Sequence, residues 1–469
     1  MRLGREMTIA SVNPATGEVL ERFEMMGAEE VEGAVAKAQR AFLDYPKVSF
    51  RQRREWMYRA ADLLVGEKER FGRMMTLEMG KTLGSAIAEV EKCAWVCRYY
   101  ADEAEGMLQD EPAQTDASSS YVRYFPLGVL LAVMPWNFPF WQVFRAAAPA
   151  LMAGNAMLLK HASNVPRSAL AIAEVFERAG FPDGMFQTLL IDVDRVESVI
   201  ADRRVKAVTL TGSGPAGAAV AAAAAKHIKK AVLELGGSDP FVVLPSADLD
   251  AAVEAAVTAR LMNNGQSCIA AKRFILVGDI ADEFEQKLAK RFSAQQVGNP
   301  LEAEVEIGPL ATAGILEELD AQVQACLRQG ARALVGGDVF GLKEKLSDDL
   351  QGGNFYPPTV LVSIPPGTPA DKEEFFGPVA LVFRVGDLEA AIALANSTDF
   401  GLGASAWTND PDEQARLING LEAGAVFING LVKSDPRLPF GGIKQSGYGR
   451  ELARYGLMEF VNAKTVWVK

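Results

Sequence analysis

Apolar residues recur at two different periods along the chain. Between Ala28 and Tyr100 they keep the spacing of amphipathic helices, whereas from Val129 onward short apolar runs of strand length alternate with helical segments. The predicted strands are 129–134, 156–159, 186–190 and 207–210, and the helices between them are 146–153, 168–179 and 216–225. This alternation predicts an α/β fold in which a parallel sheet carries helices on both faces.

A second α/β unit is predicted after Gly237. Strand-like runs at 241–244, 274–277, 331–335 and 379–383 are separated by helical patterns. We therefore expect a domain boundary near Ser238.

A polar, turn-rich stretch interrupts the first unit. Residues 111–120 are mostly polar, and residues 121–125 then alternate as a strand does. We expect a hairpin that leaves the body of the domain. The chain ends in another predicted strand, 465–469, which can pair either with 121–125 or with the sheet edge of a neighbouring subunit.

Composition and charge narrow the class of protein. A chain of 469 residues with 49% apolar and 23% charged residues predicts two or three globular domains. Its formal charge of −12 argues against nucleic acid and against an anionic membrane as partners. No apolar run approaches 18 residues, and Met1 to Ala10 shows no signal-peptide pattern, so we expect a cytoplasmic protein.

The few cysteines and histidines exclude several chemistries. Four cysteines form neither a disulfide framework nor a Cys-x-x-Cys pair, and with two histidines no metal site is expected. With so few histidines, a Ser-His-Asp catalytic triad is also not expected. Thiol chemistry here must work without an obvious histidine base.

A glycine-rich turn follows one predicted strand and opens an alanine-rich helix. Gly212, Gly214 and Gly217 match the Gly-x-Gly-x-x-Gly pattern of dinucleotide sites, in which helix amides receive phosphate oxygens. A plain tight turn is the alternative. The same pattern expects an acidic residue about 20 positions later, and Glu234 follows Gly212 by 22 residues. Glu234 is thus either a ribose ligand or a catalytic base.

Cys268 lies in a different setting from the other three cysteines. It ends the polar run Asn263-Asn264-Gly265-Gln266-Ser267, which is typical of a loop and not of a core strand. A buried, inert cysteine is the alternative. We favour a nucleophile, because the carboxyl of Glu234 could serve it as proton acceptor. The remaining cysteines, Cys93, Cys97 and Cys326, follow helical spacing and are expected to pack in the core.

Two polar residues follow predicted strands of the first sheet, at the edge where such sheets bind ligands. Asn137 lies between two prolines, and a rigidly held amide suits an oxyanion hole, although an aromatic cluster of this kind is usually core. Lys160 ends the strand 156–159, where its ammonium could meet a ribose or phosphate; a solvated surface lysine is the alternative.

Several motifs, in this order, resemble the aldehyde dehydrogenase superfamily along nearly the whole chain. They are Pro135-Trp136-Asn137-Phe138-Pro139, Leu159-Lys160-His161-Ala162-Ser163, Thr211-Gly212-Ser213, Leu233-Glu234-Leu235-Gly236-Gly237, Gly265-Gln266-Ser267-Cys268, Glu374-Phe375-Phe376-Gly377-Pro378 and Pro439-Phe440-Gly441-Gly442. Within the superfamily, residues 234–241, 160–164 and 434–437 are most similar to the bacterial succinate-semialdehyde dehydrogenases.

The resemblance implies three structural parts. These are a Rossmann-like cofactor domain (1–108 and 126–236), an α/β catalytic domain (237–437) and a β extension (109–125 and 450–469) that joins subunits into homodimers or homotetramers. It also implies that Cys268 is the nucleophile, that Asn137 with the Cys268 amide forms the oxyanion hole, and that Glu234 is the base. The implied cofactor ligands are Trp136, Lys160, Ser163, Gly212, Ser213, Gly217, Glu374 and Phe376.

At two positions the chain departs from the pattern of the family, and these positions bear on the choice of cofactor and substrate. Members strict for NAD often carry Glu where this chain has Ser163, so we expect NADP to be accepted beside NAD. Arg145 matches an arginine that grips the distal carboxylate in semialdehyde enzymes, and a surface arginine is the alternative. A second arginine is replaced by Met262, so Ser434 and Arg437 are expected to substitute. Arg145→Ala should then raise KM for succinate semialdehyde far more than for propanal.

Other functions stay open at this point. A broad scavenger of uncharged aldehydes is the main competitor, since Phe138, Phe140, Trp141 and Phe144 could line an apolar tunnel. A noncatalytic homologue would be expected to lack Cys268 or Glu234, and an enzyme acylating coenzyme A would not need Glu234. The expected reaction is therefore oxidation of succinate semialdehyde to succinate through a Cys268 thioester.

Overall fold

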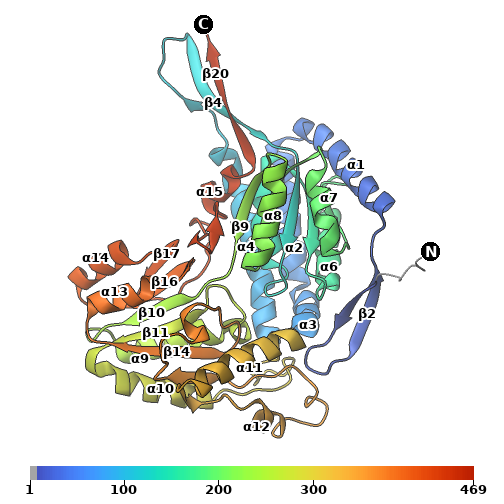
Figure 1. Ribbon diagram of the computed structural model, residues 1–469. Helices are drawn as coiled ribbons and strands as arrows, with labels where there is room; N and C mark the ends of the chain where they lie inside the picture. Colours follow the sequence, from blue (N-terminus) through green and yellow to red (C-terminus); the bar gives the residue numbers. More distant parts are fainter. Residues whose placement is uncertain (1–7) are drawn as a thin grey trace.

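The computed structural model describes residues 8–469, and two mainly parallel sheets with flanking helices form its body (Figure 1). The described part begins with an antiparallel pair, β1 (Thr8–Val12) and β2 (Val19–Glu24), which the apolar pattern did not predict. The predicted helical segment follows as α1 (Ala28–Asp44), α2 (Phe50–Gly66), α3 (Lys68–Met79) and α4 (Leu83–Met107). Cys93 and Cys97 are buried along α4, as predicted.

The first sheet is six-stranded, with the order β19-β9-β8-β5-β6-β7. Its parallel strands are β5 (Val129–Met134), β6 (Ala156–His161), β7 (Phe186–Thr188), β8 (Val205–Thr211) and β9 (Lys230–Glu234). The connecting helices are α5 (Trp141–Ala153), α6 (Pro166–Ala179), α7 (Val196–Ala201) and α8 (Gly214–Lys226). Strand β5 lies near the centre of this order, and its residues are apolar throughout because both faces of a central parallel strand are covered.

The second sheet is seven-stranded, with the order β12-β13-β14-β11-β10-β16-β17. Its strands are β10 (Asp239–Val243), β11 (Ala271–Val277), β12 (Arg332–Val335), β13 (Thr359–Val362), β14 (Val379–Val385), β16 (Gly403–Trp407) and β17 (Ala425–Ile428). Its helices are α9 (Leu249–Leu261), α10 (Ala281–Ser293), α11 (Ala313–Arg328), α12 (Val339–Lys343), α13 (Leu388–Asn396) and α14 (Pro411–Gly420). The predicted α/β class is confirmed.

A β extension projects from the body, with the chain's C-terminus at its tip (Figure 1). It consists of β3 (Glu111–Pro112), β4 (Ser119–Pro126) and β20 (Val461–Val468), and β20 pairs antiparallel with the whole of β4. The terminal strand thus takes the first of its two predicted partners, the strand around 121–125 of its own chain.

The predicted domain boundaries stay a prediction, and residues 1–7 of the first segment lie outside the described residues. After the second sheet the chain returns to the first through β19 (Gly447–Tyr448), which pairs with β9, and then forms α15 (Ala453–Met458). Two short strands, β15 (Phe400–Gly401) and β18 (Ile443–Lys444), pair nearby. None of the helices described is long and apolar enough to cross a membrane.

Candidate active site

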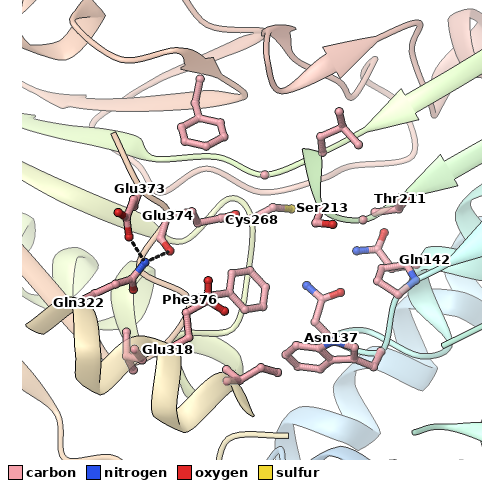
Figure 2. A pocket seen from close by; sticks show the side chains of 18 of the residues that line it. Asn137, Gln142, Thr211, Ser213, Cys268, Glu318, Gln322, Glu373, Glu374 and Phe376 are labelled. Atoms are coloured by element: carbon pink, nitrogen blue, oxygen red, sulfur yellow. Dashed lines mark hydrogen bonds between the residues drawn. The ribbon is translucent and has the colours of Figure 1, made fainter. Parts of the chain in front are cut away.

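Two cavities meet at Cys268. The larger, of about 420 Å³, lies where β5, β8 and β9 end, and Figure 2 shows the Cys268 sulfur in its wall. The smaller, of about 200 Å³, lies between α4, α5 and the loops around Met262 and Ser434. Because Cys268 and Gln142 line both cavities, a molecule in either one can reach the thiol.

The loop before Cys268 has an unusual backbone. Asn263 and Asn264 have φ of 56° and 57°, and Gly265 has φ of 75°, so three consecutive residues are left-handed. Asparagine tolerates this conformation better than most residues. A β-carbon on Gly265 would overlap with the backbone of Gly377, which belongs to the motif around Glu374. The asparagines and the glycine therefore fold the nucleophile's loop tightly against the predicted ribose-binding segment.

Buried polar side chains hold this loop in place. Arg260 is fully buried and donates to the carbonyls of Gly265 and, at 3.1 Å, of Ala271. Gln266 accepts a hydrogen bond from the Ala311 amide through its side-chain oxygen, at 2.9 Å. With these partners the loop is rigid before any ligand binds, which suits a site that must aim a nucleophile.

The Cys268 thiol is protonated at neutral pH. Burial raises its pKa to about 12, and the nearby ammonium of Lys272 opposes this effect only in part. Lys272 is fully buried and donates to the carbonyls of Ser267 and Cys268, at 2.8 and 2.7 Å. Since the thiolate is the attacking form, the site needs a further positive charge or a base to produce it.

Asn137 is placed where an oxyanion donor is needed. It follows β5, lines the larger cavity with Cys268, and points into it in Figure 2. Its Nδ2 donates to the Gln266 carbonyl at 3.2 Å, which uses one of its two hydrogens. The backbone carbonyl of Asn137 in turn accepts a hydrogen bond from the Asn263 side-chain amide at 2.7 Å. One side-chain N–H is left for a ligand oxygen.

The Glu234 carboxyl lies apart from the two cavities that Cys268 lines. It is buried at the end of β9, lines neither cavity, and its oxygens have no hydrogen-bond partner among the described residues. A β-carbon on Gly441 would lie 2.5 Å from its Oε1. Burial and the neighbouring Glu451 raise its pKa, whereas Arg145 and Arg450 oppose the rise. The structure thus shows a buried acid with a raised pKa, whose carboxyl must lose its proton and move toward Cys268 before it can act as a base there.

The larger cavity brings together five of the eight predicted cofactor residues. These are Trp136, Gly212, Ser213, Glu374 and Phe376. The rings of Trp136 and Phe376 meet edge to face, with centroids 5.7 Å apart. Glu374 accepts a hydrogen bond from the Gly237 amide at 3.1 Å. The third glycine, Gly217, packs instead against Leu235, directly after β9, since a β-carbon there would lie 2.6 Å from the Leu235 side chain.

The remaining two, Lys160 and Ser163, lie at and beyond the end of β6, outside the lining of the cavity. Burial lowers the pKa of Lys160, and Asp192 opposes the shift. No described residue forms a hydrogen bond or ion pair with its ammonium. Ser163 is exposed. Both positions are adjacent to the loop of Trp136, because Lys160 is paired with Val133 on β5.

These residues fit a dinucleotide. Helix α8 begins at the cavity, no side chain caps its first amides, and a β-carbon on Gly214 would meet no atom within 4 Å. Uncapped amides at a helix N-terminus suit phosphate oxygens. The carboxylate of Glu374 offers acceptors for ribose hydroxyls.

The three predicted substrate residues have different positions. Arg145 and Ser434 line the smaller cavity, whereas Arg437 does not; it is exposed and bound to Asp435 at 2.6 Å. Arg145 is buried and already forms an ion pair with Glu451, and it donates to Thr211 at 3.3 Å. Its role as a carboxylate ligand stays a prediction. Of the four aromatic residues considered for a tunnel, Phe138 and Trp141 line this cavity, while Phe140 and Phe144 are in the core.

Some site residues were missed in the sequence. Lys272 and Arg260 lie in the strand and the helix that flank the Cys268 loop, and their closeness in sequence to the nucleophile would have been the signal to look for. Gln142 and Lys92 line the cavities from helices α5 and α4. Nothing in their local sequence separates them from surface residues.

Known proteins share this arrangement. The model of the aldehyde dehydrogenase family matches residues 3–466. A protein of Synechocystis described as a probable NADP-dependent succinate-semialdehyde dehydrogenase is 58% identical, covering 98% of this chain and all of that protein. Succinate-semialdehyde dehydrogenase [NADP(+)] 1 of Mycobacterium bovis is 55% identical over the same shares.

A solved structure agrees with these matches. The succinic semialdehyde dehydrogenase of Streptococcus pyogenes in complex with NADP+ superposes with a TM-score of 0.94 at 36% identity, covering 98% of this chain and 99% of that one. The matches extend over both sheets and the β extension. The chain therefore belongs to the aldehyde dehydrogenase family.

Proposed function

We propose that this protein oxidises succinate semialdehyde to succinate with NADP+ as electron acceptor. The observation that carries the proposal is the position of Cys268 between two cavities, one fitted to a dinucleotide and one lined by cationic side chains. The similar proteins of Synechocystis and Mycobacterium support it, because their names give the same substrate and cofactor.

Cys268, Asn137 and Glu234 each have a separate role in the proposed reaction. The Cys268 thiol gives up its proton to solvent through Glu234, and the thiolate adds to the aldehyde carbon. The resulting oxyanion accepts hydrogen bonds from Asn137 Nδ2 and the Cys268 amide. The bound cofactor supplies the acceptor for the hydride that leaves this carbon. Glu234, once rotated toward Cys268, takes a proton from the water that cleaves the remaining thioester. Succinate leaves and the thiol is restored.

The roles of the cofactor ligands remain part of the proposal. Ser213 and the first amides of α8 would bind the pyrophosphate, Glu374 and Lys160 would each bind a ribose, and Trp136 and Phe376 would flank the cofactor. The neutral side chain of Ser163 beside Lys160 leaves room for a 2′-phosphate. The NADP+ complex of the Streptococcus pyogenes relative supports this choice.

We propose further that the protein is a homodimer or homotetramer joined by the β extension. Trp467 and Val468 on β20 and Phe125 on β4 are exposed large apolar residues on this projecting part. Light scattering after gel filtration should give two or four chains per particle. A Trp467→Glu variant that remains fully assembled would argue against this surface.

Steady-state oxidation tests the proposed reaction. We expect a much higher kcat/KM for succinate semialdehyde than for propanal, and a higher kcat/KM with NADP than with NAD. Cys268→Ser should be inactive. Glu234→Gln should release one equivalent of NADPH rapidly and then stall at the thioester, which mass spectrometry can detect. Comparable efficiency on both aldehydes would instead favour a broad-specificity enzyme and leave the mechanism intact.

A further inference from the structure

The smaller cavity contains four charged side chains, and their partners differ. Glu89 forms a buried ion pair with Lys81 and accepts hydrogen bonds from the amides of Phe140 and Trp141, both at 2.9 Å. Arg145 is paired with Glu451. Lys92 and Lys433 form no ion pair with any described residue. The cavity therefore holds two cations whose charge no protein carboxylate neutralises.

Only one of these two cations has a defined position. Lys92 lies on α4, with its Nζ 2.7 Å from the Ser434 hydroxyl and 4.3 Å from the centre of the Trp141 ring. Lys433 is exposed at the surface. An ammonium has three hydrogens, so Lys92 keeps donors for a ligand after its bond to Ser434. Ser434 accepts from Lys92 and can direct its own hydrogen to the same ligand.

The surroundings of Lys92 are unfavourable for an unpaired charge. Burial and repulsion by Arg145 lower its pKa to about 8, while Cys93, Glu89 and Asp435 act weakly in the opposite direction. Apolar side chains of Phe138, Met262 and Ile269 line the same space. A negative ligand would compensate for this burial, as the protein's own acids do not.

We propose that the Lys92 ammonium, together with the Ser434 hydroxyl, binds the carboxylate at the far end of the aldehyde substrate. Cys268 lines the same cavity, so an aldehyde carbon at the thiol and a carboxylate at Lys92 lie within one continuous space. Arg145 then stabilises the wall of the cavity through Glu451. This inference rests on the proposed function, because it requires a substrate that carries a carboxylate.

The test compares succinate semialdehyde with butanal, an uncharged aldehyde of equal chain length, at saturating NADP. Loss of a hydrogen-bonded charge contact predicts that Lys92→Gln lowers kcat/KM for the semialdehyde by about 10- to 100-fold, mainly through KM. The value for butanal should change less than about threefold. Lys433→Gln removes the other unpaired cation of the cavity, and a selective loss there as large as in Lys92→Gln would overturn the assignment to Lys92.

The pH profile separates binding from a purely structural role. For the unaltered protein, KM for the semialdehyde should rise as the pH passes through about 8, because Lys92 loses its proton there. In Lys92→Arg the rise should disappear, since arginine stays charged. Butanal reports the pH dependence of all other groups, including Cys268.

Three outcomes have distinct meanings. If Lys92→Gln lowers kcat/KM equally for both aldehydes, or keeps the preference for the semialdehyde, the inference about Lys92 is overturned. The proposed function then still stands. If the unaltered protein already oxidises butanal as well as the semialdehyde, the proposed function fails, and with it the need for a carboxylate site. A selective loss in Lys92→Gln that Lys92→Arg restores supports the proposal.

Discussion

The buried ammonium of Lys272 lies 3.0 Å from the carboxylate of Glu374. Lys272 also donates to the carbonyl of Cys268 at 2.7 Å, so one side chain connects the nucleophile's loop to the predicted ribose ligand. The two residues are far apart in sequence, on β11 and in the loop before β14. Cofactor binding and the charge around the thiol therefore depend on the same lysine.

Replacing Lys272 should weaken cofactor binding. In Lys272→Met the Glu374 carboxylate loses its ionic partner and two carbonyls lose a donor, which costs about 1 to 3 kcal/mol per unsatisfied group. We expect KM for NADP to rise about tenfold. Lys372→Met serves for comparison, because Lys372 lines the same cavity and forms no ion pair with Glu374, so its effect on KM for NADP should be smaller. An unchanged KM for NADP would contradict this role.

The reactivity of Cys268 should depend on pH and on the cofactor. A pKa of about 12 leaves roughly one thiol in ten thousand ionised at pH 8. Without cofactor, alkylation by iodoacetamide should therefore increase about tenfold per pH unit up to pH 10, with no plateau near 8.5. NADP+ should accelerate it at constant pH.

Cys268→Ser provides the blank for this measurement, because the other three cysteines are buried. If the alkylation rate of the protein without cofactor reaches a plateau near pH 8.5, burial does not strongly raise the pKa of the thiol.

A single charge at position 163 should change the cofactor preference. Ser163→Glu places a carboxylate beside Lys160, where it would repel a 2′-phosphate. The repulsion energy of two like charges a few ångströms apart near a surface is several kcal/mol at most. We expect kcat/KM with NADP to fall about tenfold or more, while the value with NAD changes little. Ser163→Gln matches the size without the charge. If kcat/KM falls equally with both cofactors, the 2′-phosphate does not bind beside residue 163.

The ion pair of Arg145 and Glu451 should contribute to stability. Both side chains are buried, and breaking a buried pair from one side costs about 3 to 5 kcal/mol. Arg145→Met should lower the free energy of unfolding by about this amount, and Arg145→Met with Glu451→Gln should recover part of it. Denaturant unfolding measures both variants.

The same variants test Arg145 as a substrate ligand. If Arg145→Met is as stable as the unaltered protein but loses affinity only for succinate semialdehyde, Arg145 binds the substrate and the structural role is wrong.

Local sequence was informative where a motif follows a strand. The predicted strand 129–134 matches β5, and the glycine-rich turn after 207–210 does begin a helix at a cavity. Strand β16 was missed, because Gly403-Ala404-Ser405-Ala406-Trp407 contains no β-branched residue and is a strand by virtue of its neighbours in the sheet. Strand β17 was missed although its composition favours a strand.

The partners of the charged site residues could not be predicted in the same way. Lys92 meets Ser434 across 342 positions, and Arg145 meets a glutamate near the end of the chain. Such contacts depend on how two sheets and their loops pack, and no local pattern encodes that packing.

The sequence by itself determined the alternation of strands and helices, the turns at the strand ends and the family motifs, because these depend on neighbouring residues. Tertiary structure decided which charges are neutralised. It paired Arg145 with Glu451, left Glu234 outside the cavities that Cys268 lines, and left Lys92 without an acidic partner among the described residues. The physical reason is that burial and distant neighbours set the free energy of a charge in a protein, and both exist only once the chain has folded.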